Sequence, residues 1–205
     1  MMTTEEQLKD IKRSFRLIMD GAVAQSMREK GVNYHLNWGA NILFLKEKAD
    51  EIGQNYDLAI ALWKEDIREC KILATMVMPP KKMLPEVLDL WVEQIPSIEI
   101  AEQLALNLVP KLPFAASKAF LFLSKSATFP QVVGYHTLSR LSMGRPELNE
   151  RAINEFIDQA VTALQSENVS LAKAAKQSLV HFAEISLMHE RLVSSATKRV
   201  GLNIL

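Results

Sequence analysis

The feature of this sequence that most constrains its fold is the position of its glycines and prolines. The chain of 205 residues has seven glycines and eight prolines, and most of them stand between segments whose apolar residues recur at helical spacing. Gly31 and Gly53 each follow such a segment, and Pro79-Pro80 ends another because proline cannot continue a helix. We predict an all-α fold, with helices that begin after the caps Asn55 and Ser97 and others at about residues 4–30, 38–52, 67–78, 85–95, 114–125, 129–143, 146–166, 169–187 and 190–200.

The predicted helices follow one another through short connections. Helices 129–143 and 146–166, and then 169–187 and 190–200, are expected to form successive antiparallel pairs with a period near 40 residues. This period is typical of HEAT-like arrays, in which each pair buries its apolar face against the next. We therefore expect residues 1–205 to form a single all-α domain, a HEAT-like helical-repeat α-solenoid.

Composition and charge narrow the class of protein. Cys70 is the only cysteine, so no disulfide can form within the chain, and the amino-terminal MMTTEEQLKD has acids where a signal peptide needs basic and apolar residues. The most apolar run, residues 114–123, is too short to span a bilayer and contains Lys118. We expect a soluble cytoplasmic protein. Its formal net charge is zero, but residues 1–110 carry 13 Lys/Arg and 17 Asp/Glu, whereas residues 111–205 carry 11 and 7.

The stretch ALWKEDIRECKILA, residues 61–74, contains a tryptophan, an arginine, a glutamate and the cysteine close together. Asp66 followed by Glu69 has the spacing of a capping box, which predicts a helix start at this point. Trp63 would then pack at a helix corner, and a salt bridge to a neighbouring helix would account for Arg68. The buried face of the new helix is predicted to consist of Ile67, Cys70, Leu73, Ala74 and Val77.

The same stretch resembles a known family. Leu62-Trp63, four further residues and then Arg68-Glu69 precede a helix rich in Ala and Leu, and the segment from Met27 to Tyr34 and the pair Leu45-Lys46 lie upstream. In this order they resemble the DNA alkylation repair family of HEAT-like-repeat glycosylases. The resemblance is best over residues 27–78 and continues more loosely to about residue 185.

The resemblance implies a function. Members of this family hold duplex DNA on a concave, basic face and cleave the N-glycosidic bond of alkylated purines. A carboxylate stabilises the positive charge that develops on the sugar. The catalytic run of the family matches Ser97–Glu102 here, with Glu102 in the catalytic position and Glu99 one turn before it. An alternative interpretation is that both acids only stabilise the positive end of their helix.

The match to the family's site is incomplete. Ser97 and Ile98 stand where the family has two tryptophans, Val132 where it has a phosphate-binding arginine, and Gln177 where it has a further tryptophan. Because these residues are unmatched, glycosylase activity and DNA binding without glycosylase chemistry both remain open. The alternative from another class is a non-catalytic helical-repeat scaffold that binds a protein partner.

A basic stretch supports DNA as the partner. From Lys111 to Arg145 the sequence has no acid, and none occurs between Asn168 and Ala183. In a solenoid such residues can form a continuous positive surface, although a solvated face is the simpler explanation for any single lysine. The predicted nucleic-acid-binding residues are Lys111, Lys118, Lys125, Arg140, Arg145, Lys173 and Lys176.

Other chemistries find no support in the sequence. The four histidines show no metal-ligand spacing, and no glycine-rich phosphate loop is present. Cys70 lies on an apolar helix face, where a thiol is expected to be inert. We expect no cofactor, no metal and no membrane association.

Overall fold

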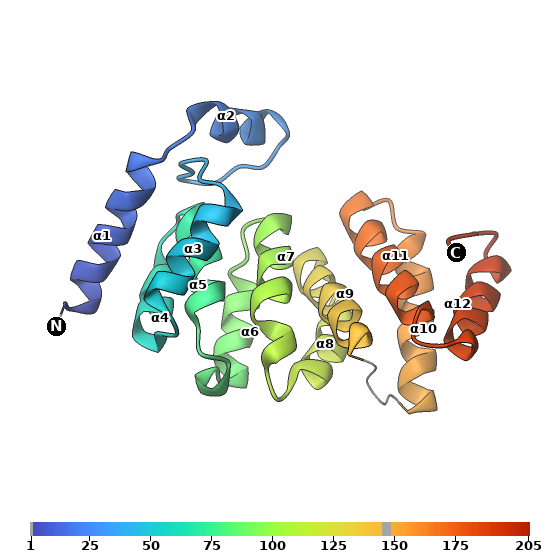
Figure 1. The fold of residues 1–205 in the computed structure, drawn as a ribbon. Helices are drawn as coiled ribbons and strands as arrows, with labels where there is room; N and C mark the ends of the chain where they lie inside the picture. The colour runs from blue at the N-terminus through green and yellow to red at the C-terminus, as the bar shows by residue number, and fades with distance from the viewer. Residues whose placement is uncertain (1, 145–148) are drawn as a thin grey trace. The chain divides into compact units, whose positions relative to one another are not determined.

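A computed structural model describes residues 2–144 and 149–205, and these are mostly helical (Figure 1). The all-α prediction is confirmed, since twelve α-helices and two short 3-10 helices occur and no strand is found in this part of the chain. Over the same residues, no helix combines the length and the apolar character that crossing a membrane requires. The chain divides into two compact units, each with its own packed helices.

Residues Met1–Leu108 form unit 1. Its centre is α5, which packs against α3, α4 and α7 and is buried at every residue except Met76. Trp63 of α4 stacks on Trp91 of α6, with ring centroids 4.2 Å apart, so the predicted packing of Trp63 at a helix corner is confirmed. The elements of this unit are α1 (Thr4–Leu17), α2 (Gly21–Glu29), α3 (Ile42–Ile52), α4 (Tyr56–Lys64), α5 (Arg68–Val77), η1 (Pro80–Lys82), α6 (Pro85–Glu93) and α7 (Ile98–Asn107).

Residues Val109–Leu205 form unit 2. Within it, α9 packs against both α8 and α11, and α11 also packs against α10 and α12. Gly134 allows the close approach of α8 and α9, because a Cβ at this position would lie 2.9 Å from the Ala119 carbonyl oxygen. The elements are η2 (Val109–Lys111), α8 (Ala115–Leu123), α9 (Thr128–Met143), α10 (Glu150–Leu164), α11 (Val169–Ala183) and α12 (Leu187–Arg199).

The first predicted helix, residues 4–30, is wrong because the segment forms two helices. Asp20 caps α2 by accepting a hydrogen bond from the Val23 amide, and the Asp20 amide donates to the Trp38 carbonyl oxygen at 2.8 Å. The next helix begins at Ile42 and not at residue 38. Gly39 has φ +74°, and its missing Cβ leaves room for the Asp20 carbonyl oxygen, so a helix cannot pass through this position.

The predicted pairing of helices in unit 2 also differs from the structure. We expected α9 to pair with α10, but α9 packs mainly against α8 and α11, and α10 packs against α11 and α12. The reason is burial: α9 has buried residues around most of its circumference and so needs a neighbour on each side, whereas α10 buries a single face. That residues 1–205 act as one domain stays a prediction.

Candidate nucleic-acid interface and the buried Arg68 network

Arg68 begins α5 and lies almost entirely inside unit 1, with 3% of its surface exposed. The residue before it, Ile67, is extended and forms an isolated parallel bridge with Leu36. Ile67 is the N-cap of α5, and no side chain caps this helix. The predicted capping box of Asp66 and Glu69 is therefore wrong.

Glu69 binds the loop before α3. Its side chain is fully buried and accepts hydrogen bonds from the Trp38 amide at 3.3 Å and the Ala40 amide at 3.2 Å. It also lies 3.1 Å from a guanidinium nitrogen of Arg68. The spacing to Asp66 suggested a local cap, but the carboxylate satisfies two buried amides that lie about thirty residues earlier in the chain.

Arg68 also pairs with Glu99 of α7, which confirms the predicted salt bridge to a neighbouring helix. Nε donates to one carboxylate oxygen at 2.8 Å and Nη2 to the other at 2.6 Å, while Nη1 donates to the Ala40 carbonyl oxygen at 2.9 Å. The Tyr34 hydroxyl donates to Glu99 at 2.6 Å and lies 2.6 Å from the Ser97 hydroxyl. We call Tyr34, Arg68, Glu69 and Glu99 the Arg68 network.

The Arg68 network keeps its charged groups charged. Burial alone would raise the pKa of Glu99, but the hydrogen bonds and charge of Arg68, with the bond from Tyr34, lower it. Burial would lower the pKa of Arg68, and its two glutamate partners raise it instead. Burial and the neighbouring Glu99 raise the pKa of Tyr34, so its hydroxyl stays a proton donor. Glu99 thus has both oxygens bonded and its charge balanced by a guanidinium.

Glu102 lies one turn after Glu99 on α7 and is exposed. Ser97 caps this helix by accepting a hydrogen bond from the Ile100 amide at 3.3 Å, as predicted. Val132, at the position of the family's arginine, is fully buried, and Gln177 is exposed on α11. The catalytic roles of Glu99 and Glu102 stay predictions.

The predicted nucleic-acid-binding residues lie in unit 2. Lys111, Lys125, Arg140, Lys173 and Lys176 are exposed, Lys118 is half-buried, and Arg145 lies outside the described residues. Helices α8, α9 and α11 contain no Asp or Glu. Because α9 packs against both of the others, the three helices are contiguous in the fold, and we call them the acid-free layer.

The acid-free layer also contains two histidines that sequence reasoning considered only as metal ligands. Asn168 bonds to Thr128 and His181 bonds to Ser139, pairs that are 40 and 42 residues apart. Helices α9 and α11 therefore run in the same direction, and His136 lies level with about residues 176–178. No group of three or more His, Cys, Asp or Glu side chains suited to a metal ion occurs in the described ranges.

His136 responds to the charges near it. Burial first, and then the positive charges of Lys173 and His181, hold its pKa below the ordinary histidine value of 6.5. Lys173 and His181 are therefore close enough to act electrostatically on the His136 ring. A signal for this grouping does exist in the sequence: Lys173 and His181 are two turns apart on one helix face, and His136 and Arg140 are one turn apart on the other helix.

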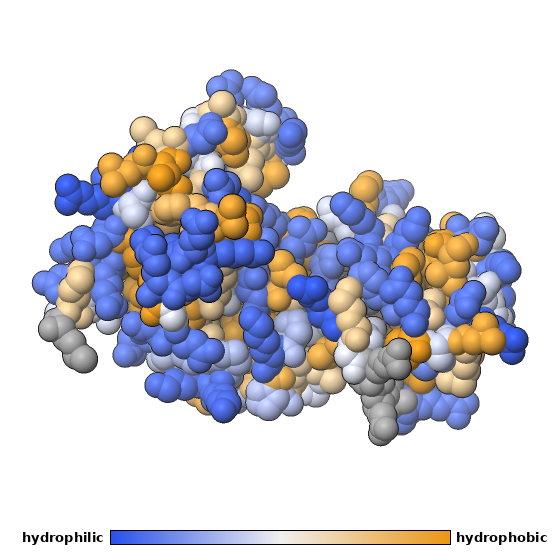
Figure 2. All heavy atoms as spheres, viewed as in Figure 1, coloured by the Kyte–Doolittle hydropathy of each residue, from blue (hydrophilic) through white to orange (hydrophobic). Residues whose placement is uncertain are grey.

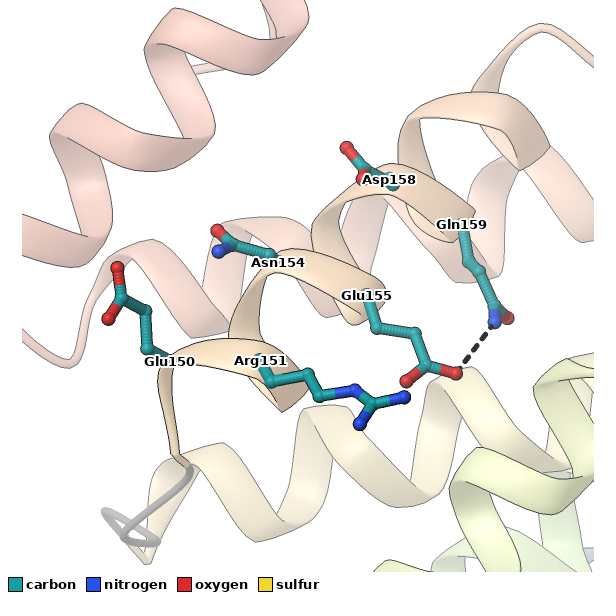
Figure 3. Close-up of a pocket in the computed structure, with 6 residues that line it drawn as sticks. All are labelled: Glu150, Arg151, Asn154, Glu155, Asp158 and Gln159. Atoms are coloured by element: carbon teal, nitrogen blue, oxygen red, sulfur yellow. Dashed lines mark hydrogen bonds between the residues drawn. The ribbon is translucent and has the colours of Figure 1, made fainter.

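Three acids of unit 2 lie together on α10. Helix α10 has a surface depression lined by six of its own side chains, among them Glu150, Glu155 and Asp158 (Figure 3). In the figure, Glu150, Asn154 and Asp158 project from one side of the helix, and Glu155 accepts a hydrogen bond from Gln159 on the other. Helix α10 therefore carries three acids and one cation, Arg151, whereas α8, α9 and α11 carry cations and no acid.

With this geometry described, the chain can be compared with known proteins. Residues 14–124, more than half of the chain, match the family described as DNA alkylation repair enzyme. The chain belongs to that family. This confirms the resemblance, and the matched range includes the whole Arg68 network and the Ser97–Glu102 run of this DNA alkylation repair family member.

One solved structure is similar to this DNA alkylation repair family member. It is described as "A new family of proteins related to the HEAT-like repeat DNA glycosylases with affinity for branched DNA structures". The TM-score is 0.83 at 15% identity, over 94% of this chain and 83% of that chain. The similarity establishes the fold, so the HEAT-like helical-repeat α-solenoid is confirmed. No curated protein matches the sequence.

Proposed function

We propose that this DNA alkylation repair family member binds DNA through the acid-free layer of unit 2 and prefers branched duplexes. The observation that carries the proposal is the absence of any carboxylate from α8, α9 and α11, of which α9 packs against both of the others. The proposed phosphate contacts are Lys111, Lys118, Lys125, Arg140, Arg145, Lys173 and Lys176.

The charge pattern fits a polyanion. Lysines and arginines that neutralise phosphates release condensed counterions, which provides affinity without reading the base sequence. The acids on α10 would repel the same phosphates, so they favour an orientation in which DNA meets the acid-free layer.

The preference for branched DNA rests on two arguments. The similar solved structure belongs to a family with affinity for branched DNA. A junction also brings the phosphates of separate arms close together, which raises the local negative potential above that of a linear duplex. A surface that binds mainly by charge should therefore hold a junction more tightly.

A competition experiment tests this proposal. The chain is expected to bind a four-way junction more tightly than a linear duplex of the same strand length, with an affinity that falls steeply as salt rises from 50 to 200 mM. The variant Lys173→Gln with Lys176→Gln should weaken binding and reduce the magnitude of the log–log salt slope by about 2. Fluorescence anisotropy at several salt concentrations measures both quantities.

The matched control removes two lysines elsewhere. Lys81 and Lys82 are exposed on η1 of unit 1, and Lys81→Gln with Lys82→Gln should leave the slope unchanged. Equal effects of the two double variants would mean that charge in general, and not the acid-free layer, determines binding. No binding to either DNA at 50 mM salt would overturn the proposal.

A second candidate function is excision of alkylated purines with Glu102 as the catalytic carboxylate. The observation that favours Glu102 over Glu99 is accessibility, since Glu102 is exposed on α7 whereas Glu99 is half-buried. A carboxylate held near the sugar would stabilise its developing positive charge.

Release of N-methylated purines from alkylated duplex DNA tests this candidate. We expect Glu102→Gln to lower the rate at least about a hundredfold, as loss of one electrostatic catalytic group does in other enzymes. Glu93→Gln, an exposed acid at the end of α6, is the control and should keep the wild-type rate. If Glu102→Gln releases purines as fast as the wild type, Glu102 has no catalytic role.

The alternative class, a scaffold for a protein partner, has one supporting observation. Leu17 at the end of α1, and Ile18 and Met19 directly after it, are exposed large apolar residues, and Figure 2 shows hydrophobic side chains at the surface there. Exposed apolar groups of this kind occur at protein interfaces. If the folded chain does not bind DNA, that result favours a scaffold for a protein partner.

A further inference from the structure

We propose that His136, Lys173 and His181 together bind one backbone phosphate of DNA, and that the two histidines do so in their protonated form. This inference rests on the proposed function, since it adds a site within the acid-free layer. It assigns to the two histidines a role that neither lysines nor arginines can fill, because only histidine changes charge near neutral pH.

The first step is geometric. Helices α9 and α11 run in the same direction with their starts joined by Asn168 and Thr128. On α11, Lys173 and His181 are two turns apart and share one face, and His136 of α9 lies level with the turn between them. The three residues therefore occupy adjoining levels where α9 packs against α11, with His136 between the levels of the other two.

The second step concerns the His181 ring. Its Nδ1 is bonded to the hydroxyl of Ser139, which is buried in α9. In the protonated ring both nitrogens carry a proton, so Nδ1–H can donate to the Ser139 hydroxyl while Nε2–H remains to donate to an anion. Ser139 thus sets the orientation of His181 without adding charge.

The third step is the surrounding charge. The elements packed against α9 are α8, α11 and η2, and their titratable or charged groups are Lys118, Lys173, Lys176, His181 and Lys111. Arg140 lies one turn further along α9 itself. None of these groups is a carboxylate, and of them Lys173 and His181 lower the pKa of His136 in the free protein. Helix α11, which contains His181, also packs against α10 and α12 and has Glu184 as its C-cap. The charged or titratable groups on those elements are Glu150, Arg151, Glu155, Asp158, His189, Glu190, Arg191, Lys198 and Arg199.

A bound phosphate makes a positive charge on the histidines favourable. Its negative charge offsets the repulsion among the three cations and favours protonation of both histidines in the complex. Binding is therefore accompanied by proton uptake. By linkage, DNA affinity must rise as pH falls from the pKa of His136 in the complex to its lower pKa in the free protein.

The experiment measures DNA affinity from pH 8.0 to 5.5 for the full chain and for single variants. For the wild type we expect affinity to rise toward low pH by up to about tenfold per unit for each linked proton. The salt slope should also steepen by about 0.9 for each protonated histidine. His136→Gln and His181→Gln should each flatten the pH dependence, so that affinity rises less between pH 8.0 and 5.5 than in the wild type. Lys173→Gln should weaken binding at every pH.

His189→Gln is the matched control, because His189 belongs to unit 2 but lies on α12 against Ser186 and Phe182. It should keep the wild-type pH dependence. Thermal unfolding of each variant at each pH separates loss of fold from loss of binding.

A second measurement does not depend on affinity. The NMR titration of the His136 ring should move to higher pH when the DNA is added. Inorganic phosphate at the same total phosphate concentration should leave the titration unchanged, and an equal shift would instead assign a site for free anions and overturn the assignment to DNA.

The two proposals fail in different ways. Absence of DNA binding at any pH would overturn the proposed function itself. Salt-sensitive binding whose pH dependence is the same in the wild type, His136→Gln and His181→Gln would leave DNA binding intact and overturn this inference.

Discussion

At Arg68, burial and ion pairing oppose one another. Removing a guanidinium from water costs several kcal/mol, and the attraction to a buried carboxylate offsets this only if the remaining donors are also bonded. Here Arg68 meets Glu99 through two bonds, and its third nitrogen reaches the Ala40 carbonyl oxygen and Glu69. Arg68 therefore joins α5 and α7 to the loop before α3.

Replacing Arg68 should destabilise unit 1 strongly. Arg68→Met leaves Glu69 and Glu99 without their cation, and breaking a buried pair in this way costs about 3–5 kcal/mol. Urea unfolding followed by tryptophan fluorescence measures the loss, because all three tryptophans, Trp38, Trp63 and Trp91, lie in unit 1.

The control for this substitution is Arg191→Met on α12, where the side chain is exposed. It should change the unfolding free energy by no more than about 0.5 kcal/mol. A loss below about 1 kcal/mol for Arg68→Met would show that the ion pairs barely exceed their desolvation cost.

At the scale of elements, α8 and α9 depend on one glycine. Alanine in place of Gly134 would add a Cβ 2.9 Å from the Ala119 carbonyl oxygen and 2.9 Å from the Leu123 side chain. Because the first of these is backbone, relief requires α8 to move away from α9.

Gly134→Ala should therefore lower stability although alanine favours helices. Overpacking costs about 1–3 kcal/mol, and the gain in helix propensity offsets about 1 kcal/mol of it. Thermal unfolding by circular dichroism measures the net effect, and hydrogen exchange should locate it in α8 and α9. Gly21→Ala in α2 meets nothing within 4 Å and serves as the control; equal melting temperatures for the two variants would contradict the role of Gly134.

Most helices could be predicted from the sequence because their start and stop signals are local. Asn55 and Ser97 cap helices as expected, and the buried face from Ile67 to Val77 is correct. The break between α1 and α2 at Asp20 was missed because apolar spacing continues across it. The hydrogen bond that fixes the break runs from the Asp20 amide to the Trp38 carbonyl oxygen, which is distant in the sequence. Glu69 was assigned to a local cap for the same reason: its partners are distant in the sequence.

At the scale of the whole molecule, the sequence shows a charge difference between its two halves. Within unit 2, the structure shows which helices carry cations without acids. The lysine-rich stretches could be predicted as a candidate site because they are continuous in the sequence. The proximity of His136 to Lys173 and His181 could not be predicted from the sequence, because it depends on the register between α9 and α11. The pairing of Arg68 with Glu99 was foreseen only as a salt bridge with an unnamed partner.

The separation of charges in unit 2 has a consequence for the approach of a ligand. Helix α10 has three carboxylates and one cation, whereas α8, α9 and α11 have cations and no carboxylate, so these four helices contribute to an electric dipole moment of the unit. In the field of a nucleic acid, such a dipole experiences a torque before any atoms touch. Encounters would then begin already oriented, and added salt would slow the arrival of the partners more than it hastens their separation.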